Sequence, residues 1–406
     1  MTTAADQVLE GLFSEAGLDD PYRYYAELHK LGPVSLLEGG GGYAAVVTGY
    51  QAADQLLRDP RFRVADDEFS DELGGVGWRE HPVLAVLNNS MMYSNGARHQ
   101  QARRLFHQVF TPRRVAELEP AVGQLVDGLM DRLAERFDHD GEADFMTEFA
   151  YPLPSGVVAA LLGIPQDDLA WFRPRVERIN DFLDVVGKTD EVLAAADQAT
   201  RELSDYYRTL IAERRKAPTD DLISQLVEAI DAGLHKVSDY DLICNLLVLF
   251  NASFVTTIHL IGNGMWLLLD RPELRPAARS AAFVEEVLRY EAPVQFVARW
   301  SEEAASLAGT VLPPKEVVLV MLGAANRDSQ RFPEPDLFDV DRPNLKPLSF
   351  GAGPHYCLGA SLARMEAQIA FPRLLERFPS LRSARPPVRN PHQFLRGFAA
   401  IPVTLT

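Results

Sequence analysis

Hydrophobic positions along the chain recur mainly at helical spacing. Apolar residues three and four apart predict helices over residues 50–59, 99–110, 112–137, 201–217 and 219–233. Short apolar runs typical of strands occur at a hairpin over 33–48, at 316–322 and at 399–406. Gly39 to Gly42 permit the tight reversal of the hairpin. Helices outnumber strands, so the pattern predicts a mainly α protein with minor sheets at its edges.

One predicted helix is apolar on nearly every side. It begins at Ser238, which forms a capping box with Asp241, and continues to about Asp270. At 1.5 Å per residue it is roughly 48 Å long, and its apolar circumference places it in the protein interior. Small polar groups nevertheless interrupt its midpoint. Such groups either bond back to the helix carbonyls, or they bend the helix or line a wet cavity. They are Asn251, Ser253, Thr256, Thr257 and His259.

Composition narrows the class of protein. The 406 residues are 47% hydrophobic, which suits a globular chain, and the net charge of -17 argues against nucleic acid or an anionic membrane as the partner. No signal peptide is visible, and no uninterrupted apolar run reaches the roughly 20 residues of a membrane helix. The two cysteines suit a reducing compartment. We expect a cytoplasmic protein, and without repeats or linkers we expect one domain over residues 1–406.

The strongest chemical signal is LSFGAGPHYCLGASLARMEAQIA, residues 348–370. Gly351, Gly353 and Pro354 predict a loop that leads to Cys357 at the start of a helix, with Gly359 just inside it. A helix N-terminus favours a thiolate over a thiol, and small glycines let a flat cofactor approach the backbone. A lone buried cysteine usually only packs. The surrounding pattern favours a cofactor ligand instead.

This segment resembles the haem-binding loop of the cytochrome P-450 superfamily, Phe-x-x-Gly-x-(His/Arg)-x-Cys-x-Gly. All fixed positions match, at Phe350, Gly353, His355, Cys357 and Gly359. The resemblance extends over almost the whole chain. It implies the cytochrome P-450 fold, a helical domain around a haem with small peripheral β-sheets. It also implies an oxidoreductase that holds haem b (iron protoporphyrin IX) and uses O2 and electrons from a redox partner.

The resemblance assigns roles residue by residue. Cys357 would be the axial thiolate ligand of the haem iron, and its electron donation favours O–O bond cleavage. The anionic haem propionates need basic partners, for which the matching positions are His99, Arg103, Arg299 and His355. Three further residues match a structural ion-pair network behind the haem, namely Glu286, Arg289 and Arg342. Cys244 is expected to be a packing residue.

The central helix departs from the family. Its usual signature, Ala-Gly-x-(Asp/Glu)-Thr-Thr, aligns with Ala252 to Thr257. Thr256 takes the alcohol position beside oxygen and Ser253 replaces the usual glycine, so these two are the expected catalytic groups. The acid position is Val255, and valine cannot relay the protons that oxygen activation consumes.

Three substitutes for the acid remain open. Ser253 and Thr256 are three residues apart, so their hydroxyls can hold a water chain along one helix face. Asn251 and His259 flank Val255 by one turn on either side, although a buried structural role for His259 is the favoured interpretation. The substrate itself is the third possible proton source.

The leading hypothesis is a bacterial monooxygenase that hydroxylates or epoxidises a small or medium organic substrate in secondary metabolism. The missing acid favours an alternative, radical C–C or C–O coupling or desaturation without oxygen insertion. A non-catalytic haem sensor or carrier ranks third, because no partner or DNA-binding segment is visible. By family position the substrate pocket would include Met91, Met92, Val248, Ala252, Gln295, Phe296 and Leu395.

Electrons are expected from ferredoxin and ferredoxin reductase, since no flavin or iron–sulfur segment follows the haem region. A basic patch would attract an acidic ferredoxin to the cysteine side. It consists of Arg103, Arg104, Arg113 and Arg114. A solvated helix face with one propionate ligand is the competing interpretation of the same residues.

Overall fold

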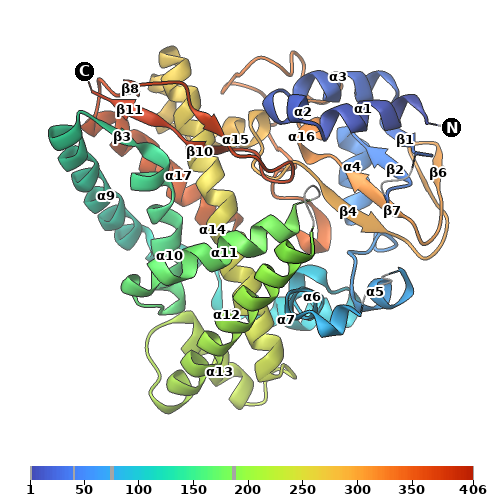
Figure 1. Ribbon diagram of the computed structural model, residues 1–406, viewed down its shortest axis with the longest axis horizontal. Coiled ribbons are helices and arrows are strands. Elements are labelled where there is room, and N and C mark those ends of the chain that lie inside the picture. The colour runs from blue at the N-terminus through green and yellow to red at the C-terminus, as the bar shows by residue number, and fades with distance from the viewer. Residues whose placement is uncertain (1, 40–41, 74–76, 185–188, 406) are drawn as a thin grey trace.

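The computed structural model describes residues 2–39, 42–73, 77–184 and 189–405. Helices dominate it, and one long helix crosses its middle (Figure 1). The α-helices are α1 (Ala4–Leu12), α2 (Glu15–Asp19), α3 (Tyr22–Lys30), α4 (Tyr50–Arg58), α5 (Asp67–Leu73), α6 (Pro82–Asn88), α7 (Gly96–Val109), α8 (Pro112–Glu117), α9 (Glu119–Asp140), α10 (Pro152–Leu162), α11 (Leu169–Leu183), α12 (Asp190–Lys216), α13 (Leu222–Asp231), α14 (Asp239–Asp270), α15 (Ala281–Tyr290), α16 (Leu322–Ala325) and α17 (Ala360–Arg377).

The strands are short and few. They are β1 (Val34–Leu36), β2 (Ala45–Val47), β3 (Glu142–Asp144), β4 (Val297–Trp300), β5 (Ala305–Leu307), β6 (Thr310–Leu312), β7 (Val317–Val320), β8 (Arg382–Ser383), β9 (Val388–Arg389), β10 (Phe398–Ala400) and β11 (Pro402–Thr404). Short 3-10 helices include η2 (Met91–Tyr93), η4 (Gln166–Asp168) and η6 (Gly353–His355), and η3 (Met146–Ala150) is a π-helical turn.

The largest sheet has the strand order β1-β2-β7-β4. The predicted hairpin is confirmed, because β1 and β2 pair antiparallel with Val34 opposite Val47. Residues 40 and 41 of its glycine turn lie outside the described residues. The predicted strand at 316–322 is also confirmed as β7, which pairs in parallel with β2. Helices α1 and α3 pack their apolar faces on this sheet, with Leu9 and Leu28 against Leu319 (Figure 1).

The C-terminal strand segment divides in two. The sequence predicts one strand over 399–406, whereas β10 pairs with β9 and β11 pairs with both β3 and β8. Ile401 separates the two strands, and its N–H donates to the Asp144 carboxylate at 2.8 Å. The chain therefore changes sheets at Ile401, and the two termini lie at opposite ends of the molecule in Figure 1.

The helix predictions hold for 50–59, 99–110 and 219–233, which correspond to α4, α7 and α13. The single helix predicted over 112–137 is wrong, because the chain forms α8 and α9 with a break at Leu118. Pro120 explains the break, since its ring excludes a continuous helical turn before it while suiting the first turn of α9. The helix predicted over 201–217 is the second half of α12. That helix begins at Asp190, directly after its N-cap residue Thr189.

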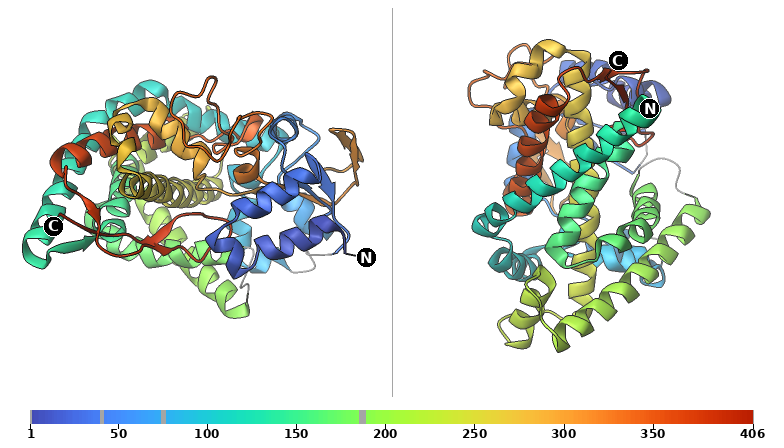
Figure 2. Two further views of the ribbon diagram at one scale, coloured as in Figure 1. Left: turned by 90° about the horizontal axis from the view of Figure 1, so that it is seen from above. Right: turned by 90° about the vertical axis from the view of Figure 1, so that its left-hand side faces the viewer.

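The central helix α14 matches its prediction closely. Ser238 and Asp241 form the expected capping box, and the helix runs 32 residues to Asp270. It is the one helix in the described parts of the chain that is long and apolar enough to cross a membrane, but 72% of the relevant window is buried within the protein. The helix packs against α10, α12, α15 and α17, and Figure 2 shows it running through the middle of the bundle.

Candidate functional site

Two glycines with a left-handed backbone conformation shape the cysteine loop. Gly351 and Gly353 have φ values of 68° and 69°, which side chains rarely tolerate. A Cβ on Gly353 would also lie 2.3 Å from the carbonyl oxygen of Leu57, so only glycine fits where the loop meets α4. The N–H of Cys357 donates to the carbonyl of Phe350 at 3.0 Å. These constraints fix Cys357 three residues before the start of α17.

The Cys357 thiol experiences opposing electrostatic effects. Burial raises its pKa, while the backbone N–H groups of Gly359 and Ala360 and the Arg103 guanidinium lower it. The lowering contributions are those expected at a helix N-terminus, but burial outweighs them and the net pKa is raised. The side chain is nevertheless accessible from outside the protein. A stable thiolate here requires a further positive charge, and coordination to a metal supplies one.

Gly359 differs from the loop glycines. Its φ is -84°, and a Cβ added to it would meet no protein atom within 4 Å. Neither backbone strain nor packing within the chain therefore requires glycine at this position. Close approach of a flat group to the backbone beside Cys357 is a physical reason for a small residue.

Four basic side chains gather beside this loop. The rings of His99 and His355 lie with their centroids 4.1 Å apart. Burial, with a smaller contribution from nearby basic groups, lowers the pKa of His99 to about 4 and that of His355 to about 3. Arg103 donates to the carbonyl of Tyr356 at 2.6 Å, which ties α7 to the cysteine loop. The cluster joins residues that are more than 250 positions apart in sequence.

Arg299 is the buried arginine of this cluster. It is 8% exposed and donates to the Ala298 carbonyl at 2.7 Å, and burial lowers its pKa to about 10. Among the described residues, no carboxylate forms an ion pair with any of the four basic side chains. The buried Nε2 of His99 also has no hydrogen-bond partner there. The buried guanidinium of Arg299, together with Arg103 and the ring N–H groups of the two neutral imidazoles, therefore forms a binding site for an anion.

Tyr93 was not anticipated from the sequence. It follows Met91 and Met92 in η2, and it lies close enough to Arg299 that each side chain shifts the pKa of the other. Burial raises the pKa of Tyr93, so the phenol stays protonated and can donate a hydrogen bond beside the guanidinium. A tyrosine in an irregular segment gives no local signal of such a contact.

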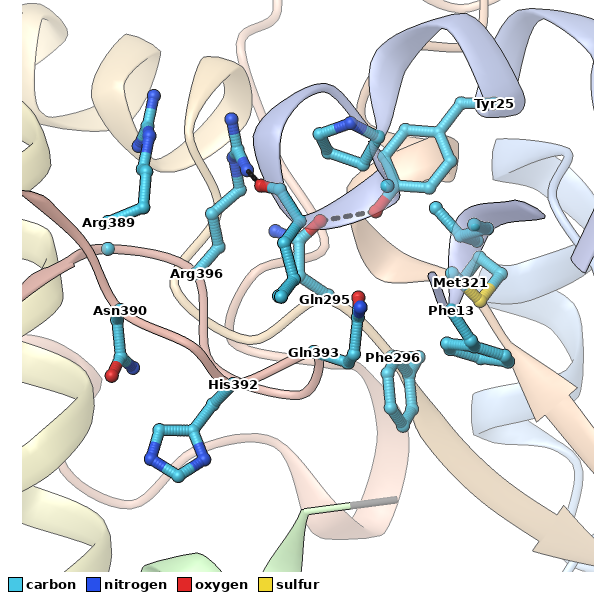
Figure 3. Close-up of a pocket in the computed structure, with 15 residues that line it drawn as sticks. Phe13, Tyr25, Gln295, Phe296, Met321, Arg389, Asn390, His392, Gln393 and Arg396 are labelled. Carbon is cyan, nitrogen blue, oxygen red and sulfur yellow. Dashed lines mark hydrogen bonds between the residues drawn. The ribbon is translucent and has the colours of Figure 1, made fainter. Parts of the chain in front are cut away.

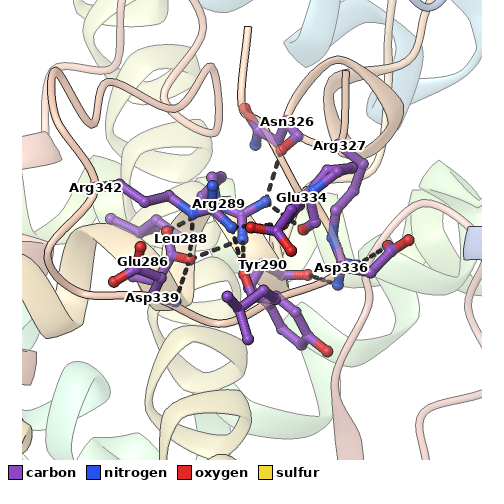
Figure 4. Close-up of polar contacts among 12 residues, drawn as sticks. Glu286, Leu288, Arg289, Tyr290, Asn326, Arg327, Glu334, Asp336, Asp339 and Arg342 are labelled. Carbon is purple, nitrogen blue, oxygen red and sulfur yellow. Dashed lines mark hydrogen bonds and ion pairs between the residues drawn. The ribbon is translucent and has the colours of Figure 1, made fainter. Parts of the chain in front are cut away.

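Glu286, Arg289 and Arg342 come together in one buried network (Figure 4). The Nε and Nη2 atoms of Arg289 each donate to Glu286 at 2.7 Å, and Arg342 donates to the same carboxylate at 3.1 Å. Arg289 also donates to the carbonyls of Asn326, Pro335 and Leu337. Each of these three charged side chains therefore has an ion-pair partner. This is expected for a network that holds a long connecting loop in place, not for one that takes part in the reaction.

One face of α14 is open at its midpoint. Five residues there are half-buried within an otherwise buried helix: Leu249, Ala252, Ser253, Val255 and Thr256. At 100° per residue they share one side of the helix, opposite Phe250 and Phe254. The Thr256 hydroxyl donates back to the Ala252 carbonyl at 2.9 Å, leaving its oxygen free to accept a hydrogen bond.

The two polar neighbours of Val255 differ from each other. Asn251 is buried, and its Oδ1 has no hydrogen-bond partner among the described residues. This oxygen can therefore accept a hydrogen bond from a donor such as water. His259 packs so tightly against Gly397 that a Cβ there would lie 2.1 Å from Nδ1. Burial lowers the pKa of His259 to about 3. His259 is therefore neutral at physiological pH, in agreement with the structural interpretation of this residue.

The expected substrate-pocket residues fall into two groups. Val248 and Ala252 lie on the open side of α14, and Met91 is fixed near that helix because its N–H donates to the Asn245 side chain at 2.7 Å. Met92 is 43% exposed. Val248, Ala252 and Met91 thus lie on or beside α14, whereas Met92 is exposed at the protein surface.

Gln295, Phe296 and Leu395 belong to a different environment. The carboxamide of Gln295 accepts a hydrogen bond from Tyr25 (Figure 3), and it donates to the Ala292 carbonyl at 2.6 Å. Phe296 packs edge-on against Phe13. Leu395 is buried and bridges to Val294. Both ends of the Gln295 carboxamide thus already have one hydrogen-bond partner within the protein. Val294 and Val297, which flank Gln295 and Phe296, are half-exposed instead.

The basic patch on α7 and α8 is partly neutralised. Arg113 is 91% exposed and bonds Glu117, while Arg114 bonds Asp220 at 2.7 Å. Arg104 is exposed on the same helix as Arg103. Carboxylates next to Arg113 and Arg114 therefore offset part of the positive charge of this patch.

Comparisons with known proteins identify the class. The family model described as Cytochrome P450 matches residues 9–281 and 279–403. Cytochrome P450 monooxygenase PikC of Streptomyces venezuelae is 37% identical over 99% of this chain and 95% of its own length. The structure of P450BioI in complex with a hexadec-9Z-enoic acid-ligated acyl carrier protein superimposes with a TM-score of 0.88 at 31% identity, covering 96% of this chain and 100% of that chain. The structure of CxnD, a cytochrome P450 for C–S bond formation in chuangxinmycin biosynthesis, gives a TM-score of 0.83 at 31% identity, covering 95% and 94%.

The chain belongs to the cytochrome P450 family, and it is an oxidoreductase with the cytochrome P450 fold. The family implies a haem-thiolate cofactor, and the residues present fit one. The accessible Cys357 sulfur, the open space over Gly359 and the unpaired basic cluster suit an iron, a flat ring and anionic propionates respectively. No group of three or more metal-binding side chains competes for this role within the described ranges.

Proposed function

We propose that this protein is a bacterial haem-thiolate monooxygenase that inserts an oxygen atom into a small or medium organic substrate in secondary metabolism. The observation that carries the proposal is the position of the accessible Cys357 at the N-terminus of α17, beside four basic groups without acidic partners. Relatives such as PikC, a monooxygenase from a Streptomyces, support the same reaction class. The chain folds as one domain and acts in the cytoplasm.

The bound cofactor would be haem b, with Cys357 as the axial ligand and His99, Arg103, Arg299 and His355 at the propionates. Bound haem supplies the reductive activation of O2. The Tyr93 hydroxyl, which lies close to Arg299, would donate a hydrogen bond to the same anionic group. Glu286, Arg289 and Arg342 hold the loop behind the cofactor and take no part in the chemistry.

Thr256 and Ser253 are the groups that handle protons at the open face of α14. The Thr256 oxygen can accept a hydrogen bond because its own hydrogen is given to Ala252. The side-chain amide oxygen of Asn251, one turn before Val255, is a second fixed hydrogen-bond acceptor. Together these oxygens can order water next to Val255 and thereby replace the carboxylate that the family usually carries there.

Electrons would come from ferredoxin and ferredoxin reductase. The exposed Arg104 on α7 and Arg113 on α8 offer positive charge to an acidic ferredoxin. Glu117 and Asp220 offset part of that charge, so the docking attraction is expected to be modest and sensitive to salt.

One observation favours a second candidate function. Val255 stands where the family usually carries the acid that supplies protons for oxygen activation, and this departure favours coupling or desaturation as the outcome. The similarity to CxnD, a cytochrome P450 for C–S bond formation, supports this alternative. Turnover under isotopically labelled O2 distinguishes the two functions. Label in the product supports the monooxygenase, whereas a coupled or desaturated product without label supports the alternative.

A further inference from the structure

A second cavity lies on the far side of α14 from the open face. It has a volume of about 520 Å³, within the range of small-molecule sites. Its floor is aromatic and comes from Tyr151, Phe172, Phe250 and Phe254. The Phe172 and Phe250 rings lie 4.8 Å apart between centroids, which joins α11 to α14 at the base of the cavity.

The position of this cavity separates it from the candidate catalytic site. Phe254 and Thr256 are two residues apart, so they point about 200° apart around the helix. Phe250 is one turn before Phe254 and shares its direction. The body of α14 therefore stands between the cavity and the residues assigned to oxygen chemistry.

The rim of the cavity is positively charged in an acidic chain. Arg132 is exposed, and in the described part of the chain it makes no ion pair. Arg173 stacks over the Tyr151 ring at 4.1 Å and bonds Glu177 at 3.0 Å. Asp167 is the one acidic side chain among the lining residues. Since Arg173 is paired with Glu177, Arg132 is the guanidinium among the lining residues that is left without an ion pair, and an aromatic floor beside it favours an apolar body that carries one negative charge.

We propose that this cavity binds a small organic anion with an aromatic body, such as an aryl carboxylate, at a site distinct from the substrate pocket. The ring would lie on Phe250 and Phe254 with its carboxylate toward Arg132. Binding would affect α14 and α11, because both helices contribute side chains to the floor of the cavity.

Calorimetric titration of the haem-loaded protein with 2-naphthoate tests the proposal. A saturating amount of 4-phenylimidazole first occupies the iron side, so binding in the substrate pocket is removed from the measurement. We expect one 2-naphthoate per chain under these conditions. The neutral 2-naphthamide should bind at least fivefold more weakly if the rim charge contributes to recognition.

Two variants and a matched control localise the binding. Ala170 is exposed at the mouth of the cavity, so Ala170→Trp fills the entrance and should abolish binding. Arg132→Glu should weaken binding about tenfold or more, and it decides the question if Ala170→Trp fails to fold. Arg178→Glu, an exposed charge reversal on α11 outside the cavity, should leave the Kd within twofold. The proposal is overturned if 2-naphthoate does not bind in the presence of 4-phenylimidazole, or if Arg132→Glu binds as tightly as the unchanged protein.

Discussion

Val255 is the residue that most sharply distinguishes this chain from the usual family pattern. It is half-buried on the open face of α14, next to Thr256. A carboxylate there would have a hydroxyl and the Asn251 oxygen nearby, and it could relay protons. We therefore expect Val255→Asp to lower the hydrogen peroxide released per electron consumed by at least twofold.

Val255→Asn is the matched control, because asparagine has nearly the shape of aspartate but cannot release a proton. Peroxide yield, product yield and NADH consumption are measured with a substrate first identified by its shift of the haem spectrum. Equal peroxide release by Val255→Asp and Val255→Asn would show that a missing acid at position 255 does not limit proton delivery.

A substitution of Arg299 tests whether this residue binds a haem propionate. Replacing it with leucine removes a buried guanidinium that has no acidic partner. We expect Arg299→Leu to release haem to apomyoglobin at least fivefold faster. The haem-free variant should nevertheless be as stable as the unchanged haem-free protein, or more so, since an uncompensated buried charge has been removed. Exposed Arg208→Leu serves as the control. Unchanged haem release would contradict the assignment.

At the scale of elements, α14 is held by its contact with the C-terminal segment. His259 lies against Gly397, and a Cβ at that glycine would approach Nδ1 to 2.1 Å and the His259 Cβ to 2.9 Å. The imidazole is buried and cannot easily move. We expect Gly397→Ala to lower the free energy of unfolding by about 1–3 kcal/mol.

Gly128→Ala is the opposite case. Gly128 is exposed within α9, and a Cβ there meets no atom within 4 Å. Alanine should therefore stabilise the helix by about 0.5–1 kcal/mol. Both values are obtained by urea denaturation of the haem-loaded protein. A Gly397→Ala variant as stable as Gly128→Ala would show that the contact with His259 is loose.

Sequence patterns predicted those features of the elements that depend on near neighbours. The capping box of Ser238 and Asp241 is local and readable from spacing, and the Glu286–Arg289 pair, which the family resemblance implied, is also local. The orientation of Gln295 was not predictable, because its partner Tyr25 lies 270 residues away. The same reason applies to Tyr93 beside Arg299, since only the tertiary structure brings them together.

The split of residues 112–137 into two helices had a visible cause in Pro120. Helical periodicity alone continued through it and concealed the break. The cysteine loop was readable for a different reason. Its glycines, its cysteine and the following helix lie within ten residues, so the local geometry of the site is encoded in one segment.

At the scale of the whole molecule, His392 joins two distant parts of the chain. Its Nδ1 lies 3.0 Å from Asp184 at the end of α11, and its Nε2 lies 3.5 Å from Asp181 (Figure 3 shows the loop that carries it). The hydrogen bond to Asp184 raises the pKa of His392, against the effect of burial. Buried His259 is the other titratable group nearby.

A raised folded-state pKa determines how stability changes with pH. The contribution of His392 is fully present below the unfolded pKa of about 6.5, and it is lost as the pH rises through the folded pKa. We expect His392→Asn to cost about 1–2 kcal/mol of unfolding free energy at pH 6 and less at pH 9. Asp184→Asn should remove the same pH dependence. An equal cost of His392→Asn at both pH values would show that its charge does not stabilise the contact.

The carbon monoxide spectrum of the reduced, haem-loaded protein tests the central claim most directly. Ligation by Cys357 predicts the red-shifted Soret band of a thiolate-bound haem. Cys357→His should move that band to the position of imidazole ligation, whereas Cys244→Ala, which removes the buried packing cysteine, should leave it unchanged. A spectrum of histidine ligation in the unchanged protein, or a red-shifted band that survives the Cys357→His substitution, would contradict the account.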